Sequence, residues 1–170
     1  MKINKPLCIV FAGAIGSSKT PIANYLSYKL NLPVFNNDAI RSEVIEDLGA
    51  MDNKIYEERR NERVKEIIEN KISFIFDASI DRVWKELKQW LQRSDYKWFI
   101  ISLDLSKGFL IELYKNKGYS ESLAMLDKLI LDHQLFVSEN LKEINLSIKD
   151  NNFKERLKLS YLAINAIRKA

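Results

Sequence analysis

The chain has 170 residues, of which 46% are hydrophobic and 29% charged, so it is long and apolar enough to form one globular domain with a full core. Its 5 glycines and 3 prolines exclude collagen-like and Pro-rich disordered classes, and its single cysteine and single histidine exclude a disulfide framework and a cysteine-based zinc site. The 27 lysines and arginines exceed the 23 aspartates and glutamates by four, a charge that suits an anionic ligand but is too weak to indicate nucleic-acid binding.

Short apolar runs alternate along the chain with longer stretches of helical periodicity, the pattern of a parallel sheet covered by helices. The runs predict five strands, at residues 7–12, 33–35, 72–76, 98–103 and 144–148. The helical stretches lie at residues 22–30, 38–48, 52–70, 83–91, 107–117, 120–137 and 153–164. No repeat, low-complexity tract or linker composition divides the chain, so residues 1–170 are expected to form a single α/β domain.

The segment GAIGSSKT lies between the first predicted strand and the first predicted helix. It matches the phosphate-binding loop (P-loop) template G-x-x-x-x-G-K-[ST] at Gly13, Lys19 and Thr20. In such a loop the backbone N–H groups and the positive end of the following helix surround an anion, the lysine reaches the β- and γ-phosphates, and the hydroxyl binds Mg²⁺. The predicted nucleotide-binding residues are Gly13, Ala14, Ile15, Gly16, Ser17, Ser18, Lys19 and Thr20.

Two residues depart from the usual P-loop pattern. Ser18 stands where the template has glycine, so the loop either tolerates a side chain there or is strained. Pro21 follows Thr20, at a position where P-loop proteins normally offer a backbone N–H to the α-phosphate, and proline has no N–H. The alternative interpretation of the segment is a Gly/Ser turn that begins a helix.

A carboxylate and a guanidinium follow the second predicted strand in the segment N-N-D-A-I-R. Their spacing places Asp38 and Arg41 on one helix face. There Asp38 could accept the proton of a substrate hydroxyl while Arg41 holds a polar or anionic group of the same substrate. In the alternative interpretation Asp38 is the N-cap of the helix and Arg41 is exposed.

A second acidic residue, Asp77, follows the apolar run of the third predicted strand in the segment F-I-F-D-A-S. At the carboxyl end of a buried strand beside the P-loop strand, a carboxylate can organise Mg²⁺ together with Thr20. The alternative is that Asp77 caps the next helix.

The P-loop, the D-x-x-R motif and the strand that ends in D-A-S together resemble P-loop kinases of the polynucleotide-kinase and zeta-toxin type. The resemblance covers nearly the whole chain in element order, although only these three short motifs carry it. It implies a three-layer α/β/α P-loop NTPase fold with a parallel sheet of about five strands and a helical lid at about residues 105–138. It also implies that Asp38 is the general base and that Arg41 contacts the substrate.

The predicted lid departs from such kinases, which usually place arginines there. This chain has the segment L-Y-K-N-K-G, in which Lys117 shares a helix face with Tyr114 while Lys115 points away. Lys117 is therefore the better candidate to neutralise the transferring phosphoryl group, and the alternative is that it is a solvated surface lysine. Arg60 lies within the apolar stripe of its helix and is a candidate for substrate contact.

These residues predict an ATP- and Mg²⁺-dependent kinase that phosphorylates a hydroxyl of a small molecule or nucleotide-like substrate. A non-catalytic nucleotide-binding module is the main alternative, and a switch NTPase ranks third because no N-K-x-D motif is found. The absence of any apolar run of membrane-spanning length favours a cytoplasmic protein without a membrane partner. A nucleic-acid partner is not favoured, but phosphorylation of a nucleic-acid end stays open, as does the oligomeric state.

Overall fold

Five strands and the helices between them follow the order predicted from the sequence, in a computed structural model that describes residues 5–119 and 123–169. The strands are β1 (Leu7–Ala12), β2 (Val34–Asn36), β3 (Phe74–Ser79), β4 (Lys97–Leu103) and β5 (Ile144–Ile148). The helices are α1 (Lys19–Leu30), α2 (Asn37–Leu48), α3 (Asn53–Glu69), α4 (Trp84–Arg93), α5 (Lys107–Lys117), α7 (Leu126–Asn140) and α8 (Arg156–Lys169), with 3₁₀ turns η1 (Leu141–Glu143) and η2 (Asp150–Glu155).

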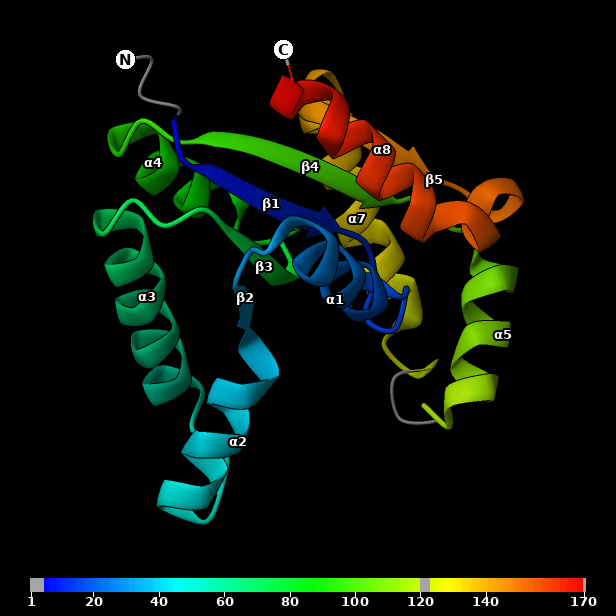
Figure 1. Ribbon diagram of the computed structural model, residues 1–170. Coiled ribbons are helices and arrows are strands. Elements are labelled where there is room, and N and C mark those ends of the chain that lie inside the picture. The colour runs from blue at the N-terminus through cyan, green and yellow to red at the C-terminus, as the bar shows by residue number, and fades with distance from the viewer. Residues whose placement is uncertain (1–4, 120–122, 170) are drawn as a thin grey trace.

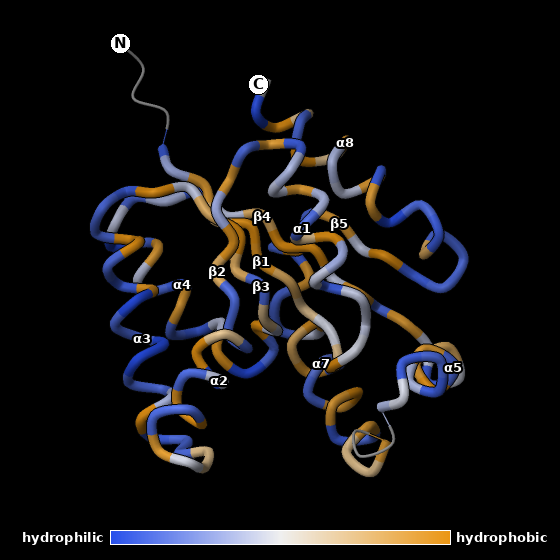
Figure 2. Tube along the Cα trace, turned by 60° about the horizontal axis from the view of Figure 1, so that its bottom comes forward, coloured by the Kyte–Doolittle hydropathy of each residue, from blue (hydrophilic) through white to orange (hydrophobic). Residues whose placement is uncertain are grey.

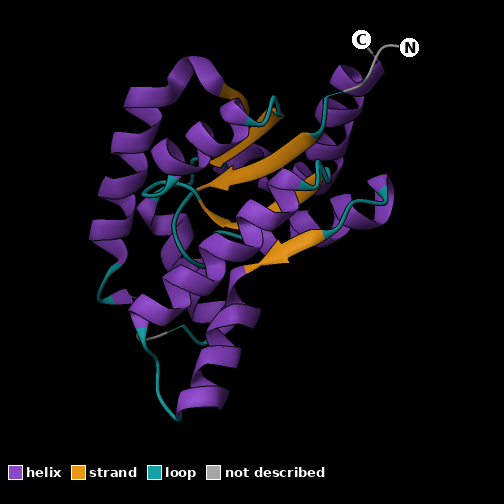
Figure 3. Cartoon of the chain, turned by 90° about the vertical axis from the view of Figure 1, so that its left-hand side faces the viewer, coloured by secondary structure: helices purple, strands orange, loops and turns teal. Residues whose placement is uncertain are grey.

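The strands form one sheet in the order β2-β3-β1-β4-β5, and each neighbouring pair is parallel. Helices cover both faces of this sheet (Figure 1, Figure 3). The predicted three-layer α/β/α fold with a five-stranded parallel sheet is therefore confirmed. Because all strands run the same way, their carboxyl ends meet at one edge, where ligands bind in open α/β sheets.

The sheet separates two hydrophobic clusters because alternate residues of β1 point to opposite faces. Ile9 and Phe11 pack with α1 and α8, whereas Cys8 and Val10 pack with α3 and α4. Figure 2 shows the apolar strands in the centre and the polar outer sides of the helices around them. A continuous apolar run such as that of β1 is the expected sequence of a strand buried on both faces.

Helix α2 begins one residue earlier than the sequence predicts. The side chain of Asn36 is the N-cap, and it accepts hydrogen bonds from the backbone N–H groups of Asp38, at 2.8 Å, and Ala39. Asp38 lies in the first turn and is exposed, so the alternative interpretation of Asp38 as the cap is wrong. Two asparagines precede Asp38, and asparagine caps helices as well as aspartate does.

The third strand lies further along the chain than predicted, at Phe74–Ser79 rather than 72–76. Lys71 has a positive φ and the N–H of Ile72 donates to the carbonyl of Ile67, so these residues complete the end of α3. At its other end β3 continues to pair beyond Phe76, with Asn36 opposite Asp77. Asp77 is thus part of the strand, and its alternative interpretation as a helix cap is wrong, because α4 begins after Val83.

The region expected to form the lid contains α5, with the predicted bounds, and α7. Gly118 ends α5 in the left-handed conformation, which glycine adopts without strain. Ser120, where the second lid helix was expected to begin, lies outside the described residues. Within the described ranges, the structure has no helix that is long and apolar enough to cross a membrane.

Candidate nucleotide and phosphoryl-transfer site

The predicted phosphate loop leaves the carboxyl end of β1 and ends at the first turn of α1. Gly13, Gly16 and Ser18 have φ values of 137°, 74° and 82°, a region that favours glycine. Ser18 therefore keeps the left-handed conformation expected of the glycine that it replaces, and its side chain is buried. The loop accommodates the side chain at some cost in backbone strain.

Lys19 folds back over the loop. Its Nζ donates to the carbonyl oxygens of Gly13, at 2.9 Å, and Ala14, at 2.7 Å. Burial lowers the pKa of the Lys19 ammonium to about 8, against the opposing influence of the Asp81, Asp77 and Asp38 carboxylates. The loop thus contains a partly desolvated cation whose present partners are neutral carbonyl groups, which an anion could replace.

Thr20 and Asp77 meet across the loop. The Thr20 hydroxyl donates to a carboxylate oxygen of Asp77 at 3.2 Å. Asp77 is buried, and burial raises the pKa of its carboxyl group, while the Thr20 hydrogen bond and the Lys19 charge oppose the increase. A hydroxyl and a carboxylate oxygen side by side are the oxygen ligands that Mg²⁺ prefers.

Asp38, Arg41 and Arg60 lie on the helices that follow β2. The Asp38 carboxylate is close enough to Asp77 and Lys19 to raise the pKa of both groups, although other causes are larger for each. The guanidinium carbons of Arg41 and Arg60 lie 5.3 and 5.7 Å from the ring centroid of Tyr56. Arg60 also donates two hydrogen bonds to the Asn61 side chain, at 3.0 and 2.9 Å. The two arginines therefore share one aromatic ring.

Helix α5 contacts the loop directly. Lys117 donates to the Gly16 carbonyl at 2.7 Å, and the buried Tyr114 hydroxyl donates to the Ile15 carbonyl. A Cβ atom at Gly16 would lie 2.7 Å from the Tyr114 ring, so this approach requires glycine. Lys117, the lysine predicted to face the site, is therefore the lysine of this segment that contacts the loop among the described residues.

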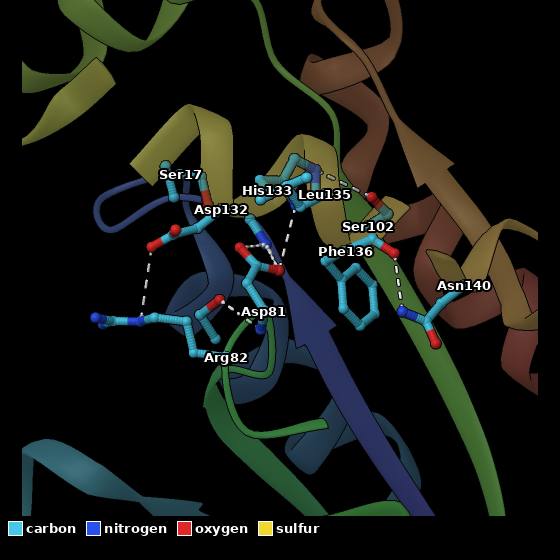
Figure 4. A network of polar contacts seen from close by, with 12 residues as sticks. Ser17, Asp81, Arg82, Ser102, Asp132, His133, Leu135, Phe136 and Asn140 are labelled. Carbon is cyan, nitrogen blue, oxygen red and sulfur yellow. Dashed lines mark hydrogen bonds and ion pairs between the residues drawn. The ribbon is translucent and has the colours of Figure 1, made fainter. Parts of the chain in front are cut away.

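A buried polar chain that the sequence analysis did not predict anchors the start of the loop (Figure 4). Both carboxylate oxygens of Asp81 accept from the Gly13 N–H, at 3.1 and 3.2 Å. His133 lies between Asp81 and Ser102, with 3.3 Å from Nδ1 to the carboxylate and 3.3 Å from Nε2 to the hydroxyl. An Nδ1–H tautomer satisfies both contacts.

The order Ser102–His133–Asp81 is also that of a nucleophilic triad. Ser102, near the carboxyl end of β4, is only 1% exposed, so no substrate reaches its hydroxyl. The network of Ser102, His133 and Asp81 is therefore structural, and it holds the start of the phosphate loop. Another residue missed by the sequence analysis is Arg156, whose Nε donates to the Ser18 hydroxyl oxygen at 3.0 Å. No motif indicates this contact, because the two residues are 138 positions apart.

Arg82, next to Asp81, has its side chain on the surface. The side chain is 67% exposed, and it lies 3.9 Å from the carboxylate of Asp132 (Figure 4).

The fold is that of known small-molecule and nucleotide kinases. No family model and no curated protein matches the sequence. A gluconokinase from Sinorhizobium meliloti aligns with a TM-score of 0.66 and 14% identity, over 96% of this chain and 94% of that chain. The APS kinase from Mycobacterium tuberculosis, solved with AMPPNP and APS, aligns with a TM-score of 0.63 and 14% identity, over 95% and 98% of the two chains. A shikimate kinase from Aquifex aeolicus aligns with a TM-score of 0.57 and 16% identity, over 96% and 99%.

These similarities define the class of protein by its fold: the chain has a P-loop kinase fold. At 14–16% sequence identity, these similarities do not identify the substrate of this protein.

The lowered pKa of Lys19 predicts pH-dependent nucleotide binding. Above about pH 8 the free protein loses the ammonium charge that a triphosphate favours, so ATP affinity should fall by up to about tenfold for each further pH unit. Isothermal titration calorimetry at about pH 7, 8 and 9 measures this slope. Lys19→Arg is the control, because arginine stays charged and should remove the slope whatever its absolute affinity. Equal wild-type affinity at about pH 7 and pH 9 would contradict the prediction.

The contact between Asp81 and Gly13 predicts a stability effect. Asp81→Ala leaves the Gly13 N–H and the His133 ring without this partner and should cost about 1–3 kcal/mol of unfolding free energy. Asp81→Asn keeps one oxygen acceptor and should cost less. Urea denaturation measures both values. Asn145→Ala is a matched control, since it removes the side-chain acceptor of a different buried backbone amide, that of Ile100. An Asp81→Ala variant as stable as the wild type would show that the contact contributes nothing.

Proposed function

We propose that the protein is an ATP- and Mg²⁺-dependent phosphotransferase that phosphorylates a hydroxyl of a small molecule or nucleotide-like substrate. The observation that carries the proposal is the hydrogen bond of Thr20 to Asp77, beside Lys19. The Asp38 carboxylate is close enough to raise the pKa of both Asp77 and Lys19. Phosphoryl transfer needs a phosphate cradle, oxygen ligands for a metal and a carboxylate near the acceptor, and these residues offer all three.

Lys19 and the loop amides would hold the β- and γ-phosphates. On binding, the Lys19 ammonium would exchange the carbonyl oxygens of Gly13 and Ala14 for phosphate oxygens. Lys117, now on the Gly16 carbonyl, would make the corresponding exchange at the outer side of the loop. Both exchanges replace a neutral acceptor with a charged one, and hydrogen bonds between charged groups are stronger.

Thr20 and Asp77 would hold Mg²⁺, which when bound neutralises charge on the phosphates. The residues fit this ion because Mg²⁺ keeps several waters and needs only one or two protein oxygens besides the phosphates. Within its described residues, the structure contains no group of three or more His, Cys, Asp or Glu side chains that could hold a metal ion.

Asp38 would accept the proton of the acceptor hydroxyl, and Arg41 and Arg60 would position the acceptor. Both guanidiniums contact the Tyr56 ring, which ties a positive charge on α2 and one on α3 to the same aromatic side chain. Two guanidiniums in this region favour an acceptor that carries an anionic or strongly polar group. The D-x-x-R motif that contains Asp38 and Arg41 is also the reason to propose kinship with the polynucleotide-kinase and zeta-toxin group. The proposed location of the protein is the cytoplasm.

A non-catalytic nucleotide-binding module is the second candidate. Two observations favour it. Tyr114 and Lys117 of α5 donate hydrogen bonds to loop carbonyl groups, and residues 105–119 include no arginine. Lysine supplies a point charge without the bidentate fork of arginine, so stabilisation of the transferring group is weaker.

Single-turnover phosphoryl transfer distinguishes the two candidates. The protein in excess over γ-labelled ATP and Mg²⁺ is incubated with a panel of hydroxyl acceptors, including sugar acids, nucleosides and nucleic-acid 5′ ends. A kinase transfers the label to at least one class of acceptor faster than it transfers the label to water by hydrolysis of ATP. ATP binding without transfer to any acceptor, and without any effect of Asp38→Asn, would support the binding module.

Asp38→Asn is expected to abolish transfer without unfolding the protein. Asn36 caps α2, so the substitution loses only the interaction of a charge with the helix N-terminus, about 0.3–1 kcal/mol. Transfer should fall by about 10²- to 10⁴-fold, the usual contribution of a general base. Melting curves and transfer rates are compared with those of Glu46→Gln, which removes an exposed carboxylate from the same helix. Undiminished transfer by the Asp38→Asn variant would exclude Asp38 as the base.

A further inference from the structure

Arg156 begins α8, and it reaches the phosphate loop from the opposite end of the sequence. Its Nε donates to the Ser18 hydroxyl oxygen at 3.0 Å and its Nη1 to the Phe153 carbonyl at 3.0 Å. The guanidinium carbon lies 4.1 Å from the centroid of the Phe153 ring. These three contacts hold the planar group in one orientation.

The charge of this guanidinium has no carboxylate partner. Within residues 5–119 and 123–169, Arg156 makes no ion pair, and its Nη2 makes no hydrogen bond. Burial lowers the pKa of Arg156, and its charge in turn helps to lower the pKa of Lys117. A half-buried, uncompensated cation beside a phosphate loop is stabilised when an anion binds.

The position of Arg156 also matches the place where the loop lacks a donor. Helix α8 lies beside α1, with Tyr25 edge-on to Tyr161 at 6.4 Å between ring centroids (Figure 1). Arg156 reaches the N-terminal end of α1, because it contacts Ser18, the N-cap residue of that helix. Pro21 lies in the first turn of the same helix and has no N–H at the position that in other P-loops serves the α-phosphate. The missing donor and the additional guanidinium therefore lie at the same end of α1.

We propose that Arg156 binds the α-phosphate of the nucleotide and replaces the amide donor that Pro21 lacks. This inference rests on the proposed nucleotide binding and adds to it a specificity-determining residue outside the P-loop motif. Nη2 is the donor available to the phosphate, while Nε and Nη1 stay with Ser18 and Phe153. The departures at Ser18 and Pro21 then have one explanation: Ser18 supplies the acceptor that orients Arg156, and Arg156 supplies the donor.

The competing explanation is that Arg156 only supports the left-handed conformation of Ser18. A double-mutant cycle with Ser18→Gly separates the two, because glycine adopts this conformation without help and has no hydroxyl. In the Ser18→Gly background the two contacts with Phe153 still hold the guanidinium. If Arg156 binds phosphate, Arg156→Gln therefore weakens binding in that background as well. If Arg156 acts only through Ser18, the same change has no effect in that background.

The experiment measures dissociation constants for Mg·ATP and Mg·ADP by calorimetry. Arg156→Gln should weaken both by the same factor, about 10- to 100-fold, because both nucleotides carry the α-phosphate. Pro21→Ala restores the missing amide and should tighten binding more in the Arg156→Gln protein than in the wild type. Arg168→Gln is the matched control, since it removes an exposed arginine from the same helix and should change neither constant.

The outcomes distinguish this inference from the proposed function. A wild-type protein that binds neither nucleotide overturns both. Two outcomes overturn the role of Arg156 alone. One is that the Arg156→Gln variant binds nucleotide as tightly as the wild type does. The other is that the effect of Arg156→Gln disappears in the Ser18→Gly background. Melting curves of each variant, recorded without nucleotide, verify that the compared proteins are folded.

Discussion

The pairing of β1 with a parallel strand on each side determines where the phosphate loop lies. β1 is buried along its whole length and is hydrogen-bonded to β3 and β4, so the chain leaves the sheet at Gly13 at a fixed point. Asp81 holds the Gly13 amide from the loop after β3, and α5 follows the end of β4. Because the neighbours are parallel, Asp77 of β3 arrives at the same edge as the loop. The strand order, rather than the loop sequence alone, brings these groups together.

Three cationic side chains reach this loop from three different helices. Lys19 comes from α1, Lys117 from α5 and Arg156 from α8, and each of them donates to an uncharged oxygen of the loop. Burial lowers the pKa of all three groups, which means that their charges are poorly solvated. A bound triphosphate would replace these uncharged acceptors with charged ones. The arrangement is thus electrostatically complementary to a polyanion.

The sequence was sufficient to predict residues whose position follows from local order along the chain. Lys19 and Thr20 begin the helix after β1, and Asp77 lies near the carboxyl end of β3, so a parallel sheet was enough to place them at one edge. The contact of Arg156 with Ser18 could not be predicted, because it depends on how α8 packs beside α1. The start of β3 was predicted two residues too early for a different reason: Lys71 adopts a left-handed conformation, usually occupied by glycine or asparagine, and Ile72 completes the turn that ends α3.

The distribution of positive charge also bears on catalysis. In a lid rich in arginine, the charge reaches the phosphates when the lid closes, and its stabilisation can be concentrated on the transition state. Here Arg156 is fixed by Ser18 and Phe153 to the scaffold, so its charge acts on the bound nucleotide at every stage of the reaction. Interactions that stabilise the ground state and the transition state equally strengthen binding without increasing the rate of the chemical step. Moving charge from the lid to α8 therefore favours tight retention of nucleotide over fast transfer, a property that the kinase and the nucleotide-binding module would share.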